Sequence, residues 1–159
     1  MRVNIFVLHS DPVRAASYHC DKHVCKMVIE SAQMLSTAHV FYGNDAPYKE
    51  SHVNHPCSKW VRESLDNYRW LCNMSLTLCK EYIRRYGKIH KCQKAIEWAI
   101  ENEPPVESVG LTPFAQAMPE QYRDDDAVDA YRKYYLGEKS RFAKWKMGDI
   151  PSWYKEKLG

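Results

Sequence analysis

Residues 56–86 read PCSKWVRESLDNYRWLCNMSLTLCKEYIRRY, and apolar side chains recur in them at steps of three and four residues. This spacing places the apolar side chains along one side of an α-helix, which has about 3.6 residues per turn. We therefore predict that one helix spans nearly the whole stretch and ends at Gly87. The side chains expected to be buried in it are Val61, Leu65, Tyr68, Cys72, Leu76, Cys79 and Ile83.

The sequence on either side of this stretch also has helical periodicity. Helices are predicted over residues 12–41, with a break near 19–21, over 88–102, and over 126–146 in one or two pieces around Gly137. The helix predicted over residues 88–102 should turn Ala95, Ile96, Ala99 and Ile100 inward. Residues 3–8 are predicted to form a short strand or an extended arm, and residues 106–122 an irregular loop. The expected fold is mainly α, a compact helical bundle of one domain (1–159) with a short extended N-terminal segment.

The composition places the chain among ordinary globular proteins. Of its 159 residues, 45% are hydrophobic and 27% are charged, which excludes a disordered or low-complexity chain. No apolar run approaches the roughly 18–20 residues of a membrane span, and the first residues lack the features of a signal peptide. We therefore expect a cytoplasmic protein, in the host cell if a phage encodes it. The six cysteines include no CxxC pair, so reduced core thiols are favoured over disulfides or a metal site, and no cofactor or metal is predicted.

The formal net charge of +3 is small, but the basic residues are unevenly distributed. They gather in residues 80–94 and 132–146, and acidic stretches lie between these two clusters. Such an asymmetry indicates an electropositive face whose natural partner is a polyanion. Arg84, Arg85 and Lys88 are candidate phosphate contacts in the first cluster. The alternative is that both clusters are ordinary solvated helix faces.

One face of the first predicted long helix carries groups that could perform chemistry. His19, Lys22 or His23, Lys26, Glu30 and Gln33 follow one another at helical spacing. Cations, a carboxylate and an amide together could bind an anion and act in acid–base catalysis. The alternative is a solvated face with a Lys26–Glu30 pair that is worth only about 0.3–0.5 kcal/mol. His55, before Pro56, could reach a ligand or simply cap and pack its helix.

Two segments carry a resemblance to a known family. Residues 22–35, KHVCKMVIESAQML, and residues 55–60, HPCSKW, resemble the pyrimidine-dimer DNA glycosylase (endonuclease V-like) family, in particular its small phage-encoded members. The beginning, RVNI, and the ending, PSWYK, are similar to the ends of the phage endonuclease. The segments 112–115, TPFA, and 134–139, YYLGEK, are also similar to small phage proteins of this family.

The resemblance implies an all-helical enzyme of DNA repair or DNA modification that binds double-stranded DNA, extrudes a nucleotide and hydrolyses an N-glycosidic bond of a pyrimidine. Glu30 would be its key carboxylate, with Lys26, His23 and His55 as the other catalytic residues. Residues expected at the substrate are Lys22, Gln33, Trp60, Arg84, Arg85, Lys88, Trp153 and Tyr154. In this family an AP-lyase step uses the amine of a small second residue. Arg2 stands at that position, so a lyase step stays a possible activity whose nucleophile is open, with the N-terminal amine of Met1 as one candidate.

Two other functions are compatible with the same residues. The first is a phage enzyme that hypermodifies pyrimidines in DNA, as a transferase or a pyrophosphorylase-like protein. The second is a non-catalytic protein that binds nucleic acid or modulates a host on the same scaffold. Both stay open because fold resemblance alone does not settle the type of reaction. The sequence also leaves open the target base, and whether the substrate is DNA or a free nucleotide.

Overall fold

The computed structural model describes residues 3–158, whose regular secondary structure is helical, with no β-strand among them. The α-helices are α1 (Pro12–Ser17), α2 (Asp21–Phe41), α3 (Pro56–Val61), α4 (Leu65–Tyr86), α5 (Gln93–Glu101), α6 (Ala127–Tyr134) and α7 (Ser152–Leu158). A 3₁₀ turn at Glu120–Tyr122 precedes α6, and a π-helical turn at Tyr135–Lys139 follows it directly. The predicted mainly α fold is confirmed.

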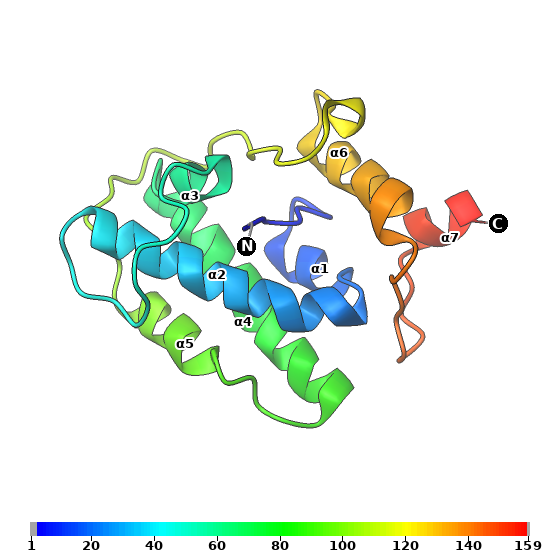
Figure 1. Cartoon of the computed structure of the whole chain (residues 1–159), viewed down its shortest axis with the longest axis horizontal. Helices are drawn as coiled ribbons and strands as arrows, with labels where there is room; N and C mark the ends of the chain where they lie inside the picture. Colours follow the sequence, from blue (N-terminus) through cyan, green and yellow to red (C-terminus); the bar gives the residue numbers. More distant parts are fainter. Residues whose placement is uncertain (1–2, 159) are drawn as a thin grey trace.

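The two longest helices, α2 and α4, pack against each other at the centre, with α1 and α5 beside them (Figure 1). Of the side chains predicted to be buried, Val61, Tyr68, Cys72 and Cys79 are buried, and Leu65 and Leu76 are half-buried. The prediction is wrong for Ile83, which is 40% exposed, while Tyr82 and Arg85 are the buried residues of the last turn. A strict seven-residue repeat drifts by about 20° per heptad on a straight helix, which moves the inward face away from Ile83.

The single helix predicted over residues 56–86 is two helices, because the chain turns at residues 62–64. Ser64 ends the turn as the N-cap of α4, where its side chain accepts a hydrogen bond from the backbone N–H of Asp66. Serine side chains at such positions satisfy an N–H that the helix leaves unpaired. The spacing of apolar residues continues unchanged across the turn. Periodicity alone therefore does not reveal that the helix is interrupted.

The N-terminal segment 3–8 is an extended arm that runs through the middle of the molecule (Figure 1). Its apolar side chains are buried, and Asn4 fastens it to distant parts of the chain. The amide of Asn4 donates to the carbonyl oxygen of Ala117 at 2.9 Å, and its oxygen accepts from the Tyr131 hydroxyl at 2.8 Å. The extended arm was one of the two predicted forms, and the short strand was the other.

The predicted boundaries fail most in the last third of the chain. Helix α6 and its π turn end at Lys139, whereas a helix was predicted up to residue 146, and Ser152–Leu158, where no helix was predicted, form α7. Residues 144–146 bond to the start of α2 instead of to a helix of their own. The backbone N–H of Asp21 donates to the carbonyl of Lys144 at 2.7 Å, and the Asp21 side chain accepts from the backbone N–H of Lys146 at 2.8 Å.

Three smaller predictions have clear outcomes. The break near residues 19–21 is confirmed, since α1 ends at Ser17 and α2 begins at Asp21. The helix predicted over residues 88–102 begins later, at Gln93, and its Ile100 is exposed instead of buried. All six cysteines are free thiols, and all but Cys25 are buried. Within the described part of the chain, no helix combines the length and the apolar character that a membrane crossing requires.

Candidate active site

A cavity of about 660 Å³ opens where the N-terminal arm, α2, the start of α3 and the α6 region meet. Its volume lies within the range of roughly 300–1,000 Å³ that is usual for small-molecule sites. Helix α2 contributes His23, Lys26 and Glu30, and the start of α3 contributes His55. The remaining lining residues include Asn4, Phe6, Gln116, Ala117, Met118, Pro119, Arg123, Tyr134, Glu138 and Lys139. Segments far apart in the sequence therefore meet in one cavity.

Glu30 is the buried carboxyl group of this cavity, with its side chain only 2% exposed. Burial raises its pKa to about 7, although the charge of Lys26, a hydrogen bond from the backbone N–H of Asn4 and the charge of Lys139 act in the other direction. Its oxygen Oε2 lies 3.9 Å from Nζ of Lys26. A carboxyl group with a pKa near 7 can gain or lose a proton at neutral pH. The alternative of a solvated surface pair is thereby excluded for Glu30.

His23 lies on the same helix as Glu30, is buried, and is uncharged at neutral pH. Burial is the main cause that lowers its pKa to about 2, and electrostatic interactions with His19 and with the cations Lys139, Lys26 and Lys22 act in the same direction. Its ring nitrogen Nδ1 lies 2.6 Å from the hydroxyl oxygen of Tyr135, in the π-helical turn. The ring therefore offers the cavity a neutral imidazole, not a cation.

A second, smaller cavity of about 380 Å³ adjoins the first. The two cavities share His23, Lys26 and Lys139. The other residues that line the second cavity are Lys22, Arg141 and Phe142, with Nζ of Lys22 4.9 Å from the centre of the Phe142 ring. Its lining includes four cationic side chains and no carboxylate. Such a concentration of positive charge attracts anions.

Of two further candidate residues, His55 lines the main cavity and Gln33 does not. His55 caps α3, where its Nδ1 accepts a hydrogen bond from the backbone N–H of Cys57 at 3.0 Å, and it also lines the main cavity. The capping role is confirmed, and a contact between His55 and a ligand stays a prediction. Gln33 is not among the residues that line either cavity, and its side-chain oxygen is buried without a hydrogen-bond partner among the described residues.

The aromatic residues expected at the substrate are mostly in the core. Trp60 is 2% exposed and its ring N–H donates to the carbonyl oxygen of Thr112. Tyr154 is buried against Trp145, with ring centres 4.8 Å apart. Trp153 is half-buried, and the guanidinium of Arg132 lies 5.2 Å from its ring centre. The expectation that Trp60 and Tyr154 meet a substrate is corrected, because packing removes both side chains from the surface.

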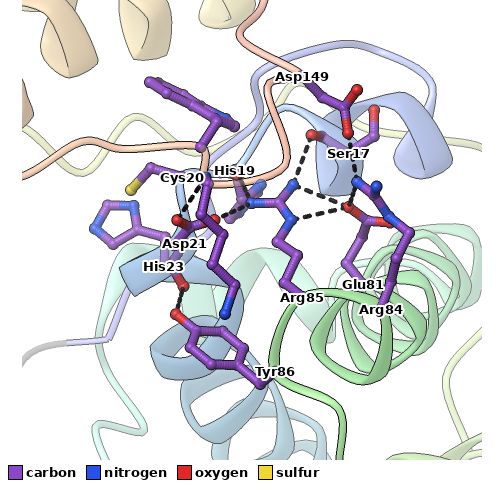
Figure 2. A network of polar contacts seen from close by, with 12 residues as sticks. Ser17, His19, Cys20, Asp21, His23, Glu81, Arg84, Arg85, Tyr86 and Asp149 are labelled. Atoms are coloured by element: carbon purple, nitrogen blue, oxygen red, sulfur yellow. Dashed lines mark hydrogen bonds and ion pairs between the residues drawn. The ribbon is translucent and has the colours of Figure 1, made fainter.

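Arg85 is also corrected, because its side chain is 1% exposed and is fully engaged inside the protein (Figure 2). Its guanidinium donates to the carbonyl oxygens of His19 and Ser17 and pairs with Glu81 and Asp21. A guanidinium with these partners is not available to a phosphate.

Its neighbour Arg84 is partly exposed but pairs with Glu81 at 2.9 Å and Asp149 at 2.6 Å. Lys88 is exposed just beyond α4.

Sequence reasoning missed the residues that the α6 region brings to the cavities. Tyr134, Glu138 and Lys139 line the main cavity, and Arg141 lines the second. Lys139 and Arg141 were counted only as members of a basic cluster, and the YYLGEK segment was noted only for its resemblance. Nothing local in the sequence connects these residues with Glu30, more than a hundred residues earlier.

Comparison with known proteins identifies the chain's relatives at the family level. The family model described as pyrimidine dimer DNA glycosylase matches residues 3–94, which is more than half of the chain. The matched residues include Glu30, Lys26, His23 and His55, whereas the α6 side of the cavity lies outside them. No curated protein and no solved structure matches the chain. The matched length leads to one conclusion: this chain belongs to the pyrimidine dimer DNA glycosylase family.

Proposed function

We propose that the protein is an N-glycosylase that releases a damaged pyrimidine from double-stranded DNA, with Glu30 as its key carboxylate. The observation that carries the proposal is the buried carboxyl group of Glu30, with a pKa of about 7, in a cavity that also holds Lys26 and Lys139. Membership of the pyrimidine dimer DNA glycosylase family supports DNA as the substrate.

The chemistry requires that the nucleotide leaves the duplex, because stacking and pairing shield the bond to be cleaved. As the base departs, positive charge develops on the deoxyribose. A carboxylate at Glu30 would stabilise this charge or take a proton from an attacking water. The ammonium groups of Lys26 and Lys139 would favour departure of the base, because electron density moves onto it.

In this proposal the second cavity binds the backbone of the DNA strand. Lys22, Lys26, Lys139 and Arg141 line it, so a phosphate of the DNA backbone would find several cations and no competing carboxylate. Because Lys26 and Lys139 line both cavities, a phosphate in the second cavity would place the attached sugar near Glu30.

An AP-lyase step would need an amine that attacks C1′ of the abasic sugar, loses water and forms an imine. The β-elimination that follows breaks the bond to the 3′ phosphate. Lys26 and Lys139 carry the amines at the main cavity, and residues 1 and 2, including Arg2, lie outside the described residues. Borohydride reduction on an abasic duplex, followed by peptide mapping, would identify the attached residue.

Glu30→Gln is the direct test of the proposed function. This change keeps the shape of the side chain but removes its charge, so base release from a duplex with a cyclobutane pyrimidine dimer should fall by about 100-fold or more. Folding and most DNA binding should persist. In the wild type, kcat/KM should rise as the pH passes through about 7, since the carboxylate is the active form.

Glu97→Gln is the matched control, because Glu97 is an exposed carboxylate on α5 and should not affect turnover. Full activity in a folded Glu30→Gln variant would contradict the assignment. If the wild type adds mass to a pyrimidine-containing duplex and releases no base, the hypermodification alternative replaces the glycosylase.

A further inference from the structure

The hydroxyl group of Tyr135 decides which nitrogen of the His23 ring carries the proton. Its oxygen lies 2.6 Å from Nδ1 of His23 and also accepts a hydrogen bond from the backbone N–H of Cys20 at 3.2 Å. A hydroxyl group has one proton to donate, and the acceptors within reach are Nδ1 of His23 and, at 3.5 Å, Sγ of Cys20. The ring nitrogen is the nearer and the stronger acceptor. It therefore takes the hydrogen bond, and the proton of the neutral ring lies on Nε2.

Both partners of this hydrogen bond are held in place by the residues around them. Tyr135 is completely buried in the π-helical turn, and burial raises the pKa of its hydroxyl group well above the usual value, so the group keeps its proton. The His23 ring packs against Phe6, with ring centres 4.4 Å apart, and against Phe142, with ring centres 5.5 Å apart. Ring packing and the hydrogen bond at Nδ1 together fix the orientation of the imidazole.

Nε2 is the ring nitrogen through which His23 reaches the two cavities. His23 lines both of them, and its Nε2 makes no hydrogen bond to the residues that the structure describes. It is not sealed off in the core, unlike Nε2 of His19, which is buried without a partner there. Burial lowers the pKa of His23 to about 2, so the ring stays neutral beside Lys26 and Lys139. The cavities are thus offered an N–H donor that carries no charge.

We propose that Tyr135 is a positioning residue, which holds the His23 ring so that Nε2–H donates a hydrogen bond to an anionic oxygen of the DNA backbone. The proposal rests on the binding of a backbone phosphate in the second cavity, which is part of the proposed function. With the proton on Nδ1 instead, the lone pair of Nε2 would face the phosphate and repel it. His23 is therefore a donor that contacts the strand, and not the general base of the reaction. Tyr135 lies outside the residues that the family model matches, so the match alone does not assign it this role.

NMR of the full-length protein with ¹⁵N-labelled histidine measures the tautomer of His23 directly. In the wild type, Nε2 of His23 should be protonated and Nδ1 should not. A duplex with a tetrahydrofuran abasic analogue, which holds no base to release, should move the Nε2 resonance when it binds. A proton on Nδ1, or an Nε2 resonance that the duplex leaves unchanged, would overturn the proposal.

Two amide substitutions of His23 separate a donor at Nε2 from a donor at Nδ1. The side-chain nitrogen of glutamine reaches about as far as Nε2, and that of asparagine about as far as Nδ1. His23→Gln should therefore bind the abasic-analogue duplex within about threefold of the wild type, and His23→Asn about tenfold more weakly, the loss expected for a hydrogen bond to a charged group. Fluorescence anisotropy measures both affinities. Equal losses in the two variants would contradict a donor at Nε2.

Tyr135→Phe keeps the ring and removes the hydroxyl group, so it tests the positioning role. It should weaken binding of the same duplex about tenfold and shift the Nδ1 resonance of His23, which a merely structural role would not do. Tyr86→Phe is the matched control, because the Tyr86 hydroxyl donates to the backbone carbonyl of Asp21 at 2.7 Å, at the start of the same helix, and lies outside both cavities. This control should bind the duplex as the wild type does.

A double-mutant cycle shows whether Tyr135 acts through His23. In the His23→Gln background, Tyr135→Phe should have little further effect on duplex binding, because the imidazole that Tyr135 positions is gone. The full loss of affinity in that background would refute positioning through His23.

The outcomes distinguish this proposal from the proposed function. If the variants bind as expected but the wild type releases no base from dimer DNA, the glycosylase proposal fails and the positioning role stands. If base release is intact but His23→Gln and His23→Asn bind alike, the positioning proposal alone fails. Should Tyr135→Phe not fold, the tautomer in the wild type and the comparison of the two His23 variants still decide.

Discussion

The pKa of Glu30 depends on its burial, on the charge of Lys26 and on the backbone of Asn4, and its position in the helix does not reveal all of these. Its spacing on α2 puts it on one face with Lys26, but the N-terminal arm reaches it through the backbone of Asn4. Burial outweighs the attraction of the neighbouring cations, so the pKa of the carboxyl group rises to about 7 instead of falling. The ionised form that the proposed reaction needs is therefore costly to the folded protein.

This cost predicts a pH dependence of stability. Between pH 4.5 and about 7 the folded protein holds a proton on Glu30 that the unfolded chain releases, so raising the pH through this window lowers the free energy of unfolding. The loss should approach about 3 kcal/mol above pH 7. Glu30→Gln removes it, so the variant should gain stability relative to the wild type between pH 5 and pH 8.

Urea unfolding of both proteins at the two pH values measures this difference. Buried His19 and His23, whose pKa values are lowered to about 4 and about 2, destabilise both proteins equally as the pH falls below about 6.5, so they cancel in the comparison. A stability difference that does not change with pH would mean that Glu30 titrates normally.

At the scale of the helices, the end of α4 holds together elements that the sequence does not connect. Arg85 bonds to the carbonyl oxygens at the end of α1 and in the turn before α2, and to Asp21 at the start of α2 (Figure 2). Asp21 in turn bonds to the backbone of residues 144–146, and Arg84 pairs with Asp149. The segment between the π turn and α7 is fixed in this way, although it has no helix of its own.

Arg85→Ala should therefore act on stability and not on DNA binding. Removing one partner leaves buried carbonyl oxygens and Asp21 without donors, so we expect a loss of about 3–5 kcal/mol in the free energy of unfolding. Arg84→Ala is the control on the same turn, with a loss of about 1 kcal/mol or less because its pairs are exposed. Chemical denaturation measures both, and equal losses would refute the buried network.

At the scale of the whole molecule, the cavities join two parts of the chain. The family-matching part supplies Glu30, Lys26 and His23, and the region of α6 supplies Tyr134, Lys139 and Arg141. The basic cluster of residues 132–146 therefore contributes to the candidate site. In the cluster of residues 80–94, by contrast, both arginines are engaged with acidic partners.

The salt dependence of DNA binding should reveal which cluster contacts phosphates. Lys22→Gln and Arg141→Gln should each reduce the slope of log affinity against log salt by about 1, since each removes one phosphate contact. Arg84→Gln should leave the slope unchanged, because Glu81 and Asp149 already neutralise this arginine. Fluorescence anisotropy with a labelled duplex measures the slope. A larger effect at Arg84 than at Arg141 would place the DNA on the other face.

The sequence by itself determined the helical class, the two long helices and the helix position of Glu30, because periodicity and capping depend on residues within about four positions of one another. It could not show that Ser64 interrupts the long helix, since the apolar period runs on through the turn. Only the tertiary structure decided which of two adjacent arginines is buried, that Trp60 and Tyr154 belong to the core, and that Lys139 lines the same cavity as Glu30. These outcomes depend on contacts such as that between Asn4 and Tyr131, which join the two ends of the chain. A local sequence pattern does not indicate which distant segment of the chain will pack against it.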